Sequence, residues 1–394
     1  MLSEGMSPGD EGRTTTREKI TESVVDGESD QVTSIYDTRR IVTFCVASYF
    51  FIMTAFIVPL ACVSTVILIY PLIFINMKLF LLLENRLCRF VNDHWVAASA
   101  YCGLKLDEYG DDISSLSEER VLFLSNHLGL VDHFIIMNAL HNKGSVSGRW
   151  MWVIYNIWKY TPLGAMWTSH GNFFVNGGRT KRERLLGTFR KHLGDYFWSW
   201  KYGWVVMYPE GSRLFIIRES ASRFADKEGL SPLSHCAYPR TGAAHAVMQV
   251  CAPSIDNSEL SQNGGGPPID YIIDATLGYP KGVVPDLGNA ILGEWTNGDG
   301  RLAIHYKIHK SRPEWSDEEK LKEFLYECYR EKDTLLEEYY EKDSFPGKAR
   351  HVQVNTWTIL ASQLFWISVY YIHYVLWIRP SCVYILSSIS SFFF

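Results

Sequence analysis

The chain has 394 residues and a formal net charge of −5, a length that allows one large domain or two modest ones. So small a net charge does not indicate a nucleic-acid-binding protein or a strongly acidic partner. The 13 Trp, 22 Tyr and 21 Phe fit a protein at a bilayer interface, although an ordinary aromatic core would give similar counts. The eight cysteines show no CxxC pair and no metal-ligand spacing. We therefore expect free thiols facing the cytosol, without disulfides or a metal site.

Residues 1–38 are rich in Ser, Thr, Gly and acidic side chains and lack an apolar face, so we predict a disordered tail. This tail is not a signal peptide, because the apolar stretch that follows it begins too late and runs too long.

A long apolar run follows the tail, with no charged residue from Ile41 to Met77. As one helix it would be about 55 Å long, whereas the apolar core of a bilayer is about 30 Å thick. Pro59 and Pro71 offer places for a break. Basic residues flank the run on both sides, which favours a cytosolic location for both ends. They are Arg39, Arg40, Lys78, Arg86 and Arg89. We predict a membrane hairpin over residues 39–84, spanning or monotopic; the alternative is one tilted span followed by an interfacial helix.

The chain ends on a second apolar segment. Trp357–Ile378 contains no Lys, Arg, Asp or Glu and is long enough to cross a bilayer. We predict that Arg379-Pro380 ends this helix and that Ser381–Phe394 is too short to cross again. Residues 346–394 are therefore expected to form a C-terminal membrane anchor whose topology the sequence leaves open.

Residues 85–345, between the apolar segments, are expected to form a globular domain. Runs rich in β-branched and aromatic residues predict four buried strands, at Val121–Ser125, Trp204–Tyr208, Tyr271–Leu277 and Leu302–Ile308. Apolar residues at helical spacing predict helices around Leu185–Trp200 and over Glu318–Tyr340. Strands that alternate with helices indicate an α/β fold, with a sheet flanked by helices.

The first chemistry-bearing motif surrounds His127. This residue follows a predicted strand, and an apolar helix begins just after it at Val131–Leu140, so the imidazole lies at the carboxyl end of a strand, where open α/β sheets bind their ligands. A hydroxyl attacking an acyl carbonyl needs a base that titrates near neutral pH, and histidine is the natural choice. Asp132, five residues on, can accept the other ring N–H and fix the tautomer. No G-x-S-x-G motif occurs in the chain, so we expect a substrate to supply the attacking oxygen.

The second motif, Tyr-Pro-Glu-Gly-Ser-Arg, follows another predicted strand. It offers a carboxylate at Glu210, a turn at Gly211 and a guanidinium at Arg213, which can bind two oxygens of a phosphate. Each motif alone has an ordinary structural explanation, as a histidine at a strand end or as a turn. Their order, between two apolar anchors, favours an enzyme that acts on a lipid phosphate.

These motifs resemble those of the glycerophospholipid acyltransferases, the family of the lysophosphatidate and lysocardiolipin acyltransferases. Asn126-His127 with Asp132 is similar to the first block of that family, and Pro209–Arg213 is similar to its third. The other matching segments are Leu277–Pro285, which resembles the proline-containing fourth block, and Tyr238–Thr241 and Lys332–Glu337, which are similar to the lysocardiolipin acyltransferase branch. The resemblance covers roughly residues 85–345.

The resemblance implies a mixed sheet flanked by helices, and an acyl-CoA-dependent transfer without a covalent acyl-enzyme or a prosthetic group. It makes His127 the general base on a lysophospholipid hydroxyl and Asp132 its orienting partner. The residues that it assigns to the acceptor headgroup are Glu210, Gly211, Ser212 and Arg213. His133, beside Asp132, is expected to be packed or solvated without a role of its own.

The chain departs from the family pattern in two places. Gly129 stands in the first block where many relatives have Ser or Thr, a position not expected to touch the proton transfer. The second block, Gly171–Gly177, lacks its usual terminal arginine, and Arg179 is a candidate substitute. The basic cluster Arg179–Arg184 is either the solvated start of a helix or a contact for anionic lipid or CoA phosphates. This departure leaves open which headgroup is bound, whereas the prediction of acyl transfer does not depend on it.

We therefore predict an integral membrane acyltransferase of the endoplasmic reticulum or another endomembrane, with its catalytic domain in the cytosol. Its substrates would be acyl-CoA and an anionic lysophospholipid, such as lysophosphatidate, lysophosphatidylinositol or a lysocardiolipin-like lipid. One alternative is a CoA-independent lipid transacylase with the same His–Asp pair. The other is a non-catalytic lipid-binding membrane protein, against which the intact base and phosphate-binding residues count.

Overall fold

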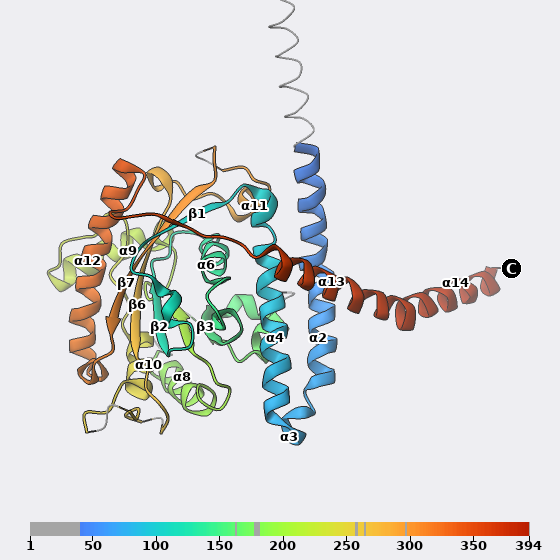
Figure 1. Ribbon diagram of the computed structural model, residues 1–394, viewed down its shortest axis with the longest axis horizontal. Coiled ribbons are helices and arrows are strands. Elements are labelled where there is room, and N and C mark those ends of the chain that lie inside the picture. Colours follow the sequence, from blue (N-terminus) through green and yellow to red (C-terminus); the bar gives the residue numbers. More distant parts are fainter. Residues whose placement is uncertain are drawn as a thin grey trace, which may run out of the picture. The chain divides into compact units, whose positions relative to one another are not determined.

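The computed structural model describes residues 40–161, 164–176, 182–256, 259–263, 265–295 and 298–393. The predicted tail, residues 1–38, and Arg179 lie outside this part of the chain. Met1–Tyr49 and Phe50–Phe394 are separate compact units. The described residues of the first unit are helical, and the second unit contains a sheet with helices around it (Figure 1).

Over the described residues the sheet has eight strands, in the order β4-β3-β5-β2-β6-β7-β1-β8. They are β1 (Lys105–Gly110), β2 (Val121–Ser125), β3 (Trp150–Tyr155), β4 (Phe173–Val175), β5 (Trp204–Met207), β6 (Tyr271–Gly278), β7 (Arg301–Lys310) and β8 (Arg350–His351). Neighbouring strands are parallel except for the antiparallel pairs β6–β7 and β1–β8. The predicted mixed α/β fold is confirmed.

Alternate side chains of β2 enter two separate hydrophobic cores. Val121 and Phe123 belong to one core and Leu122 and Leu124 to the other, as the two-residue repeat of a strand requires. The helices of the first core include α4 (Met77–Val96), α6 (Asp132–Leu140) and α11 (Leu287–Ile291), and those of the second include α8 (Arg182–Tyr196), α10 (Gly242–Cys251) and the start of α12 (Glu318–Lys342). The sheet is thus the middle layer of three.

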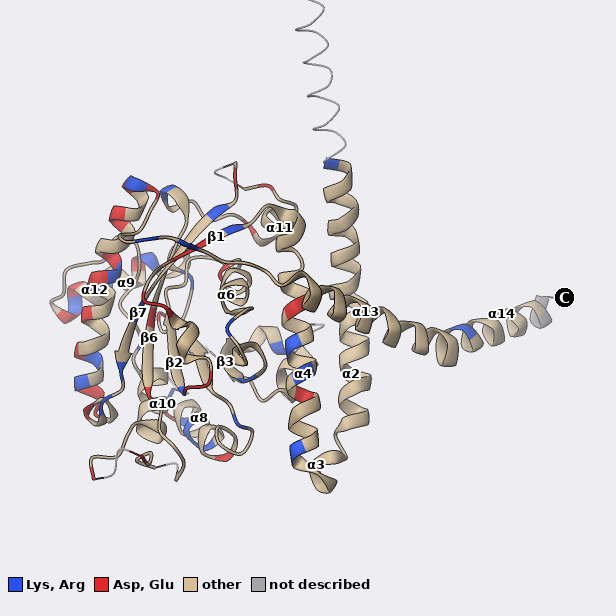
Figure 2. Cartoon of the chain, viewed as in Figure 1, with Lys and Arg blue, Asp and Glu red and all other residues tan. Residues whose placement is uncertain are grey.

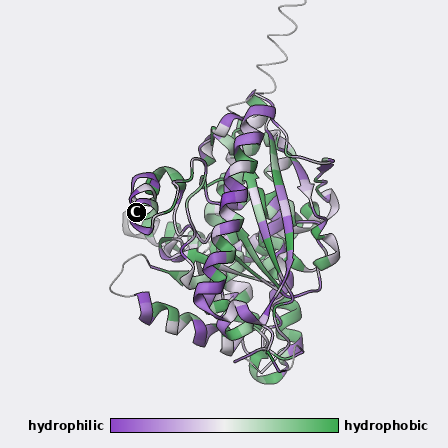
Figure 3. Ribbon diagram, turned by 90° about the vertical axis from the view of Figure 1, so that its left-hand side faces the viewer, coloured by the Kyte–Doolittle hydropathy of each residue, from purple (hydrophilic) through white to green (hydrophobic). Residues whose placement is uncertain are grey.

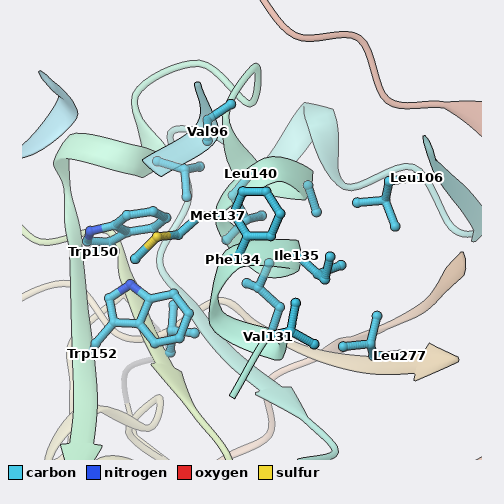
Figure 4. Close-up of a cluster of buried hydrophobic side chains, with 14 of the residues drawn as sticks. Val96, Leu106, Val131, Phe134, Ile135, Met137, Leu140, Trp150, Trp152 and Leu277 are labelled. Atoms are coloured by element: carbon cyan, nitrogen blue, oxygen red, sulfur yellow. The ribbon is translucent and has the colours of Figure 1, made fainter. Parts of the chain in front are cut away.

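Helix α6 lies deep in the first core. Apolar residues from one end of it to the other allow burial on every side, and eight of its nine residues are buried. Figure 4 shows its side chains beside Trp150 and Trp152 of β3 and Leu277 of β6. The helix therefore carries its first residue, Asp132, into the protein interior.

All four predicted strands and the predicted helices are present, as β2, β5, β6, β7, α6, α8 and α12. The strands that the sequence did not predict include β1, whose sequence is rich in charged residues. Its Glu108 is buried and lies 2.8 Å from Lys143 Nζ, so a cation brought from elsewhere in the chain allows this polar strand to enter the sheet.

Only one of the two prolines of the first apolar run interrupts the helix. A π-helical turn at Met53–Ile57 directly precedes α2 (Val58–Ile69), where Pro59 is the second residue. The missing N–H of that proline therefore falls where regular α-helical bonding is already interrupted, and the helix continues. Pro71, in contrast, lies in the turn between α2 and α3 (Leu72–Ile75).

The helical path ends at Asn76, whose backbone is extended (φ −154°, ψ 90°) between α3 and α4. Helix α4 then runs back and packs against both α2 and α6 (Figure 1). Unlike α2 it carries charged residues (Figure 2), and some of them, such as Glu84 and Asp93, are buried. A polar link joins it to both candidate membrane helices: His94 Nε2 lies 2.8 Å from Thr54 Oγ1, and Gln363 of α13 (Thr356–His373) donates to His94 Nδ1 at 3.1 Å. Helix α4, which begins inside the predicted membrane segment 39–84, therefore packs in the core of the globular part of the chain as well.

The C-terminal helix continues through Pro380, so the prediction that Arg379-Pro380 ends it is wrong. A π-helical turn at Tyr374–Ile378 joins α13 to α14 (Arg379–Phe393), with Pro380 in the second position. The missing N–H is accommodated as it is at Pro59. Among the described residues, Arg40–Ile75 and Thr356–Ser390 are long and apolar enough to cross a membrane.

Helix α12 has a largely hydrophilic outer face (Figure 3), whereas its inner face bonds to β6 and to a neighbouring loop. The buried Lys332 donates to the Ala275 carbonyl at 2.5 Å and lies 2.9 Å from Asp274 Oδ1. The next residue, Asp333, accepts the backbone N–H groups of residues 234–236. Lys332 and Asp333 of α12 thus connect β6 with the loop that precedes α10.

Candidate active site

The amide of Asn126 fixes the point at which the chain leaves β2. It is buried and bonds to both backbone groups of Leu277 in β6: Nδ2 donates to the carbonyl at 2.9 Å, and Oδ1 accepts the N–H at 2.8 Å. This extends the β2–β6 pairing by one residue beyond the strand end. His127 therefore leaves the carboxyl end of the sheet at a defined position.

The structure brings the two predicted catalytic residues together. His127 Nδ1 lies 2.8 Å from Asp132 Oδ2, and the histidine side chain is 15% exposed while the aspartate side chain is fully buried. Because Nδ1 faces the carboxylate, Nε2 is the ring nitrogen available to a substrate. The arrangement is that of a base held and oriented by a buried acid.

Asp132 accepts three further hydrogen bonds. The backbone N–H groups of Leu128 and Gly129 donate to Oδ2 at 2.6 and 3.0 Å, and the Tyr279 hydroxyl donates to Oδ1 at 2.6 Å. Burial and the neighbouring Asp132 raise the pKa of Tyr279 well above its usual value, so the hydroxyl stays protonated and remains a donor. Tyr279 lies in the segment that resembles the fourth block, but its contact with Asp132 was not predicted from the sequence.

Two more side chains that the sequence did not implicate surround the imidazole. The Tyr208 ring stacks on the His127 ring, with centroids 4.2 Å apart and planes inclined by 16°. The Tyr208 hydroxyl lies 3.3 Å from Nδ1 of His133. The expectation that His133 is merely packed or solvated therefore overlooked a defined contact beside the base.

The structure places Glu210 away from the position expected for a headgroup ligand. Its side chain is fully buried, and Oε1 accepts the backbone N–H of His127 at 3.1 Å. Burial raises the pKa of its carboxyl group well above the usual value. Glu210 therefore holds the His127 backbone in place from inside the protein.

The rest of this motif forms a turn that leads into α9 (Leu214–Glu228). Gly211 has a positive φ of 79°, which favours glycine, and Ser212 is partly exposed beside it. Arg213 is the residue just before the helix, and the following N–H, that of Leu214, donates to the His127 carbonyl at 2.9 Å. The third-block turn is therefore bonded directly to His127.

Arg213 lies on the wall of an open cleft beside His127. The loop that follows His127, the start of α9 and the segment after β6 contribute to the same cleft. Among the described residues its charged side chains are Arg213, Arg218, Lys281 and Asp286. No carboxylate of the described residues pairs with Arg213, and its guanidinium lies over the Phe215 ring, 5.1 Å from the centroid. Of the four expected headgroup residues, Arg213 alone lines this cleft.

The unusual Gly129 has a steric explanation. A Cβ atom at this position would lie 2.5 Å from Cγ1 of Val284, in the segment after β6. The valine side chain therefore occupies the space that a serine or threonine would need. The proposed substitute arginine, Arg179, lies outside the described residues, and within those residues no group of three His, Cys, Asp or Glu side chains could hold a metal ion.

Comparisons with known proteins identify the family of this chain. The family model described as "Acyltransferase" matches residues 108–262, and the model described as "Acyltransferase C-terminus" matches residues 301–366. The acl-12 protein of Caenorhabditis elegans, which carries the name of a 1-acyl-sn-glycerol-3-phosphate acyltransferase, is 52% identical over 360 residues, covering 91% of this chain and 92% of its own.

Human acyl-CoA:lysophosphatidylglycerol acyltransferase 1 is 29% identical over 321 residues, covering 77% of this chain and 86% of its own. The crystal structure of PlsC, the 1-acyl-sn-glycerophosphate acyltransferase of Thermotoga maritima, aligns with a TM-score of 0.41 and 12% identity over 76% of this chain and 98% of that one. The identity with the nematode protein extends over almost the whole of both chains. This chain therefore belongs to the glycerophospholipid acyltransferase family.

Proposed function

We propose that the protein transfers an acyl chain from acyl-CoA to the free hydroxyl of an anionic lysophospholipid, with His127 as the general base. The observation that carries this proposal is that the His127–Asp132 pair lies beside the boundary between the cationic cleft and an apolar cavity. Leu130 and Leu287 line both of them. A substrate with an apolar chain and an anionic headgroup can therefore contact both surfaces next to the base.

The lining of the apolar cavity is suited to part of an acyl chain. Side chains from α4, α6, β3 and α7 (Gly164–Ser169) line it, and most are aromatic or aliphatic, including Trp95, Met137, Trp150 and Met166. Each methylene group that enters such a cavity gains about 0.8 kcal/mol relative to water. The cavity thus supplies binding energy for the chain, while the cleft supplies it for the headgroup.

The geometry supports a direct transfer. Nε2 of His127 takes the proton of the acceptor hydroxyl as its oxygen forms a C–O bond to the thioester carbonyl carbon. The carbonyl electron pair moves onto oxygen and returns as the C–S bond breaks, and the departing CoA sulfur receives the proton from His127. Buried Asp132 stabilises the intervening imidazolium. CoA is a product of this reaction, and no prosthetic group takes part.

The names of the relatives make lysophosphatidate and lysophosphatidylglycerol the first acceptors to test, beside lysophosphatidylinositol and lysocardiolipin. Purified protein is incubated with each lysolipid and radiolabelled acyl-CoA, and we expect label in the acylated product of an anionic acceptor. Label that moves only from a phospholipid donor would indicate a transacylase instead. If no donor acylates any acceptor, a non-catalytic lipid-binding protein becomes the better explanation.

Arg213→Lys is expected to raise the KM for the lysophospholipid about tenfold, because an ammonium keeps the charge but loses the two-pronged contact with phosphate. The KM for acyl-CoA should stay unchanged. The matched control is Arg223→Lys, on the exposed surface of α9, the helix that follows Arg213, where the arginine is paired with Glu219. A rise in the acyl-CoA KM alone would assign this cleft to the other substrate.

Tyr279→Phe is expected to lower kcat about ten- to a hundredfold, because the Asp132 carboxylate loses one hydrogen bond of about 1.5–3 kcal/mol. Steady-state rates measure the effect. Tyr306→Phe is the control, because the Tyr306 hydroxyl donates to another buried carboxylate of the sheet, Glu108, at 3.0 Å. Equal losses of activity in the two variants would mean that Tyr279 acts on stability alone.

We also propose an endomembrane location, in the endoplasmic reticulum or a related compartment, with the catalytic domain in the cytosol. Basic residues flank the first apolar run on both sides, and no further candidate span lies among the described residues between it and His127. Protease added to sealed, cytosol-side-out microsomes should digest a tag at residue 1 and a tag at residues 264–266. Protection of only one tag would show that an odd number of crossings separates them.

A further inference from the structure

His133 occupies a distinct position between the catalytic base and the apolar cavity. It is the second residue of α6, and its ring centroid lies 6.2 Å from that of His127. The ring packs edge-to-face against Trp152, with centroids 4.9 Å apart, and lines the apolar cavity. A polar ring is therefore present where the acyl chain of the proposed substrate would approach His127.

The surroundings of His133 define its protonation. Burial and the neighbouring His127 lower the pKa of His133 to about 3, so the ring is neutral at physiological pH. Burial and Asp132 raise the pKa of Tyr208 well above its usual value, so the Tyr208 hydroxyl stays protonated and can donate to Nδ1 of His133, 3.3 Å away. The proton of the neutral ring is then on Nε2, which has no hydrogen-bond partner among the described residues.

Nearby backbone donors are already engaged. The N–H groups of Leu128 and Gly129 donate to Asp132, and that of His127 donates to Glu210. An acyl transfer places negative charge on the carbonyl oxygen, and preorganised donors at that oxygen are usually the largest catalytic contribution. These three N–H groups could bind the oxyanion only if they gave up the hydrogen bonds that orient His127.

We propose that Nε2–H of His133 donates a hydrogen bond to the thioester carbonyl oxygen and stabilises the oxyanion that forms there. This inference rests on the proposed function. When the acceptor oxygen bonds to the carbonyl carbon, the C=O electron pair moves onto the oxygen facing His133 while the acceptor proton moves to His127. A neutral donor suits this position, because a second cation beside the His127 imidazolium would be repelled. The hydrogen bond from His133 weakens again when the C–S bond breaks and the carbonyl re-forms.

The test compares His133→Phe, which keeps a ring against Trp152 but has no donor, with His133→Gln, which retains an N–H. Loss of one oxyanion donor should lower the kcat of His133→Phe about 10²–10³-fold with little change in either KM. The kcat of His133→Gln should be about tenfold higher than that of His133→Phe. The acid limb of the pH profile should stay where the wild type has it. The control, His192→Phe, changes another half-buried histidine, which contacts Phe173 and Tyr196, and should leave kcat unchanged.

A binding measurement separates chemistry from shape. An alkyl-CoA thioether has no carbonyl oxygen, so His133→Phe should bind it as tightly as the wild type does. A kcat within about threefold of the wild type, or weakened thioether binding that accounts for the loss, would overturn the role of His133. A wild-type protein that transfers no acyl group would instead overturn the proposed function, so the two failures are distinguishable.

Discussion

Replacing His127 with alanine is expected to lower kcat about 10²–10⁴-fold, equivalent to about 3–5 kcal/mol of activation free energy. The reason is that Nε2 of His127 is the nitrogen left free by the bond from Nδ1 to Asp132. Acylation of the preferred lysophospholipid by labelled acyl-CoA measures the loss. The KM values for both substrates should change much less than kcat, because His127 lines neither the apolar cavity nor the cationic cleft.

The control for this variant is His245→Ala. The His245 side chain is 12% exposed, close to the 15% of His127. Its ring bonds to the Ser316 carbonyl and has no contact with Asp132 among the interactions of the described residues. Both variants should fold and insert into membranes, as judged by thermal unfolding and by carbonate-resistant membrane association. A His127→Ala protein that turns over at a near-normal rate would remove the histidine from the mechanism.

Spacing in the sequence was sufficient to predict the His127–Asp132 pair, because both residues belong to one strand–loop–helix segment. Contacts between distant segments were not predictable in the same way. Tyr279 reaches Asp132 only because β6 lies beside β2, and Lys332 reaches β6 only because α12 packs on the sheet. A single sequence contains no direct signal for such pairings, since they depend on strand order.

Burial was the second quantity that the sequence could not supply. Glu210 is in a motif typical of phosphate binding, yet its carboxyl group points into the interior and supports the His127 backbone. Conversely, Pro59 and Pro380 indicated helix breaks that do not occur, because a π-helical turn precedes each of them. Strand and helix periodicity, in contrast, depends on local patterning, and the central strands were predicted almost to the residue.

Asp132→Asn is expected to lower kcat nearly as much as His127→Ala, by about 10³–10⁴-fold. At Oδ2 the carboxylate accepts three N–H groups, from the His127 ring and from the Leu128 and Gly129 backbone. If the asparagine oxygen takes this position, its NH₂ group faces Tyr279, whose hydroxyl can rotate to accept. The loop geometry can then persist, while the negative charge that stabilises the His127 imidazolium is lost.

The opposite orientation of the asparagine amide places its NH₂ group against three N–H donors. Either the loop then moves away, or the proton of the His127 ring shifts from Nδ1 to Nε2. In both cases the double variant His127→Ala/Asp132→Asn should be no slower than His127→Ala alone, because Asp132 acts through the histidine. Asp93→Asn is the matched control, since Asp93 Oδ1 lies 3.1 Å from His141 Nδ1 in a buried pair outside the site. If the two losses multiply in the double variant, Asp132 has a role in the reaction that is independent of His127, and the pair is not a single catalytic unit.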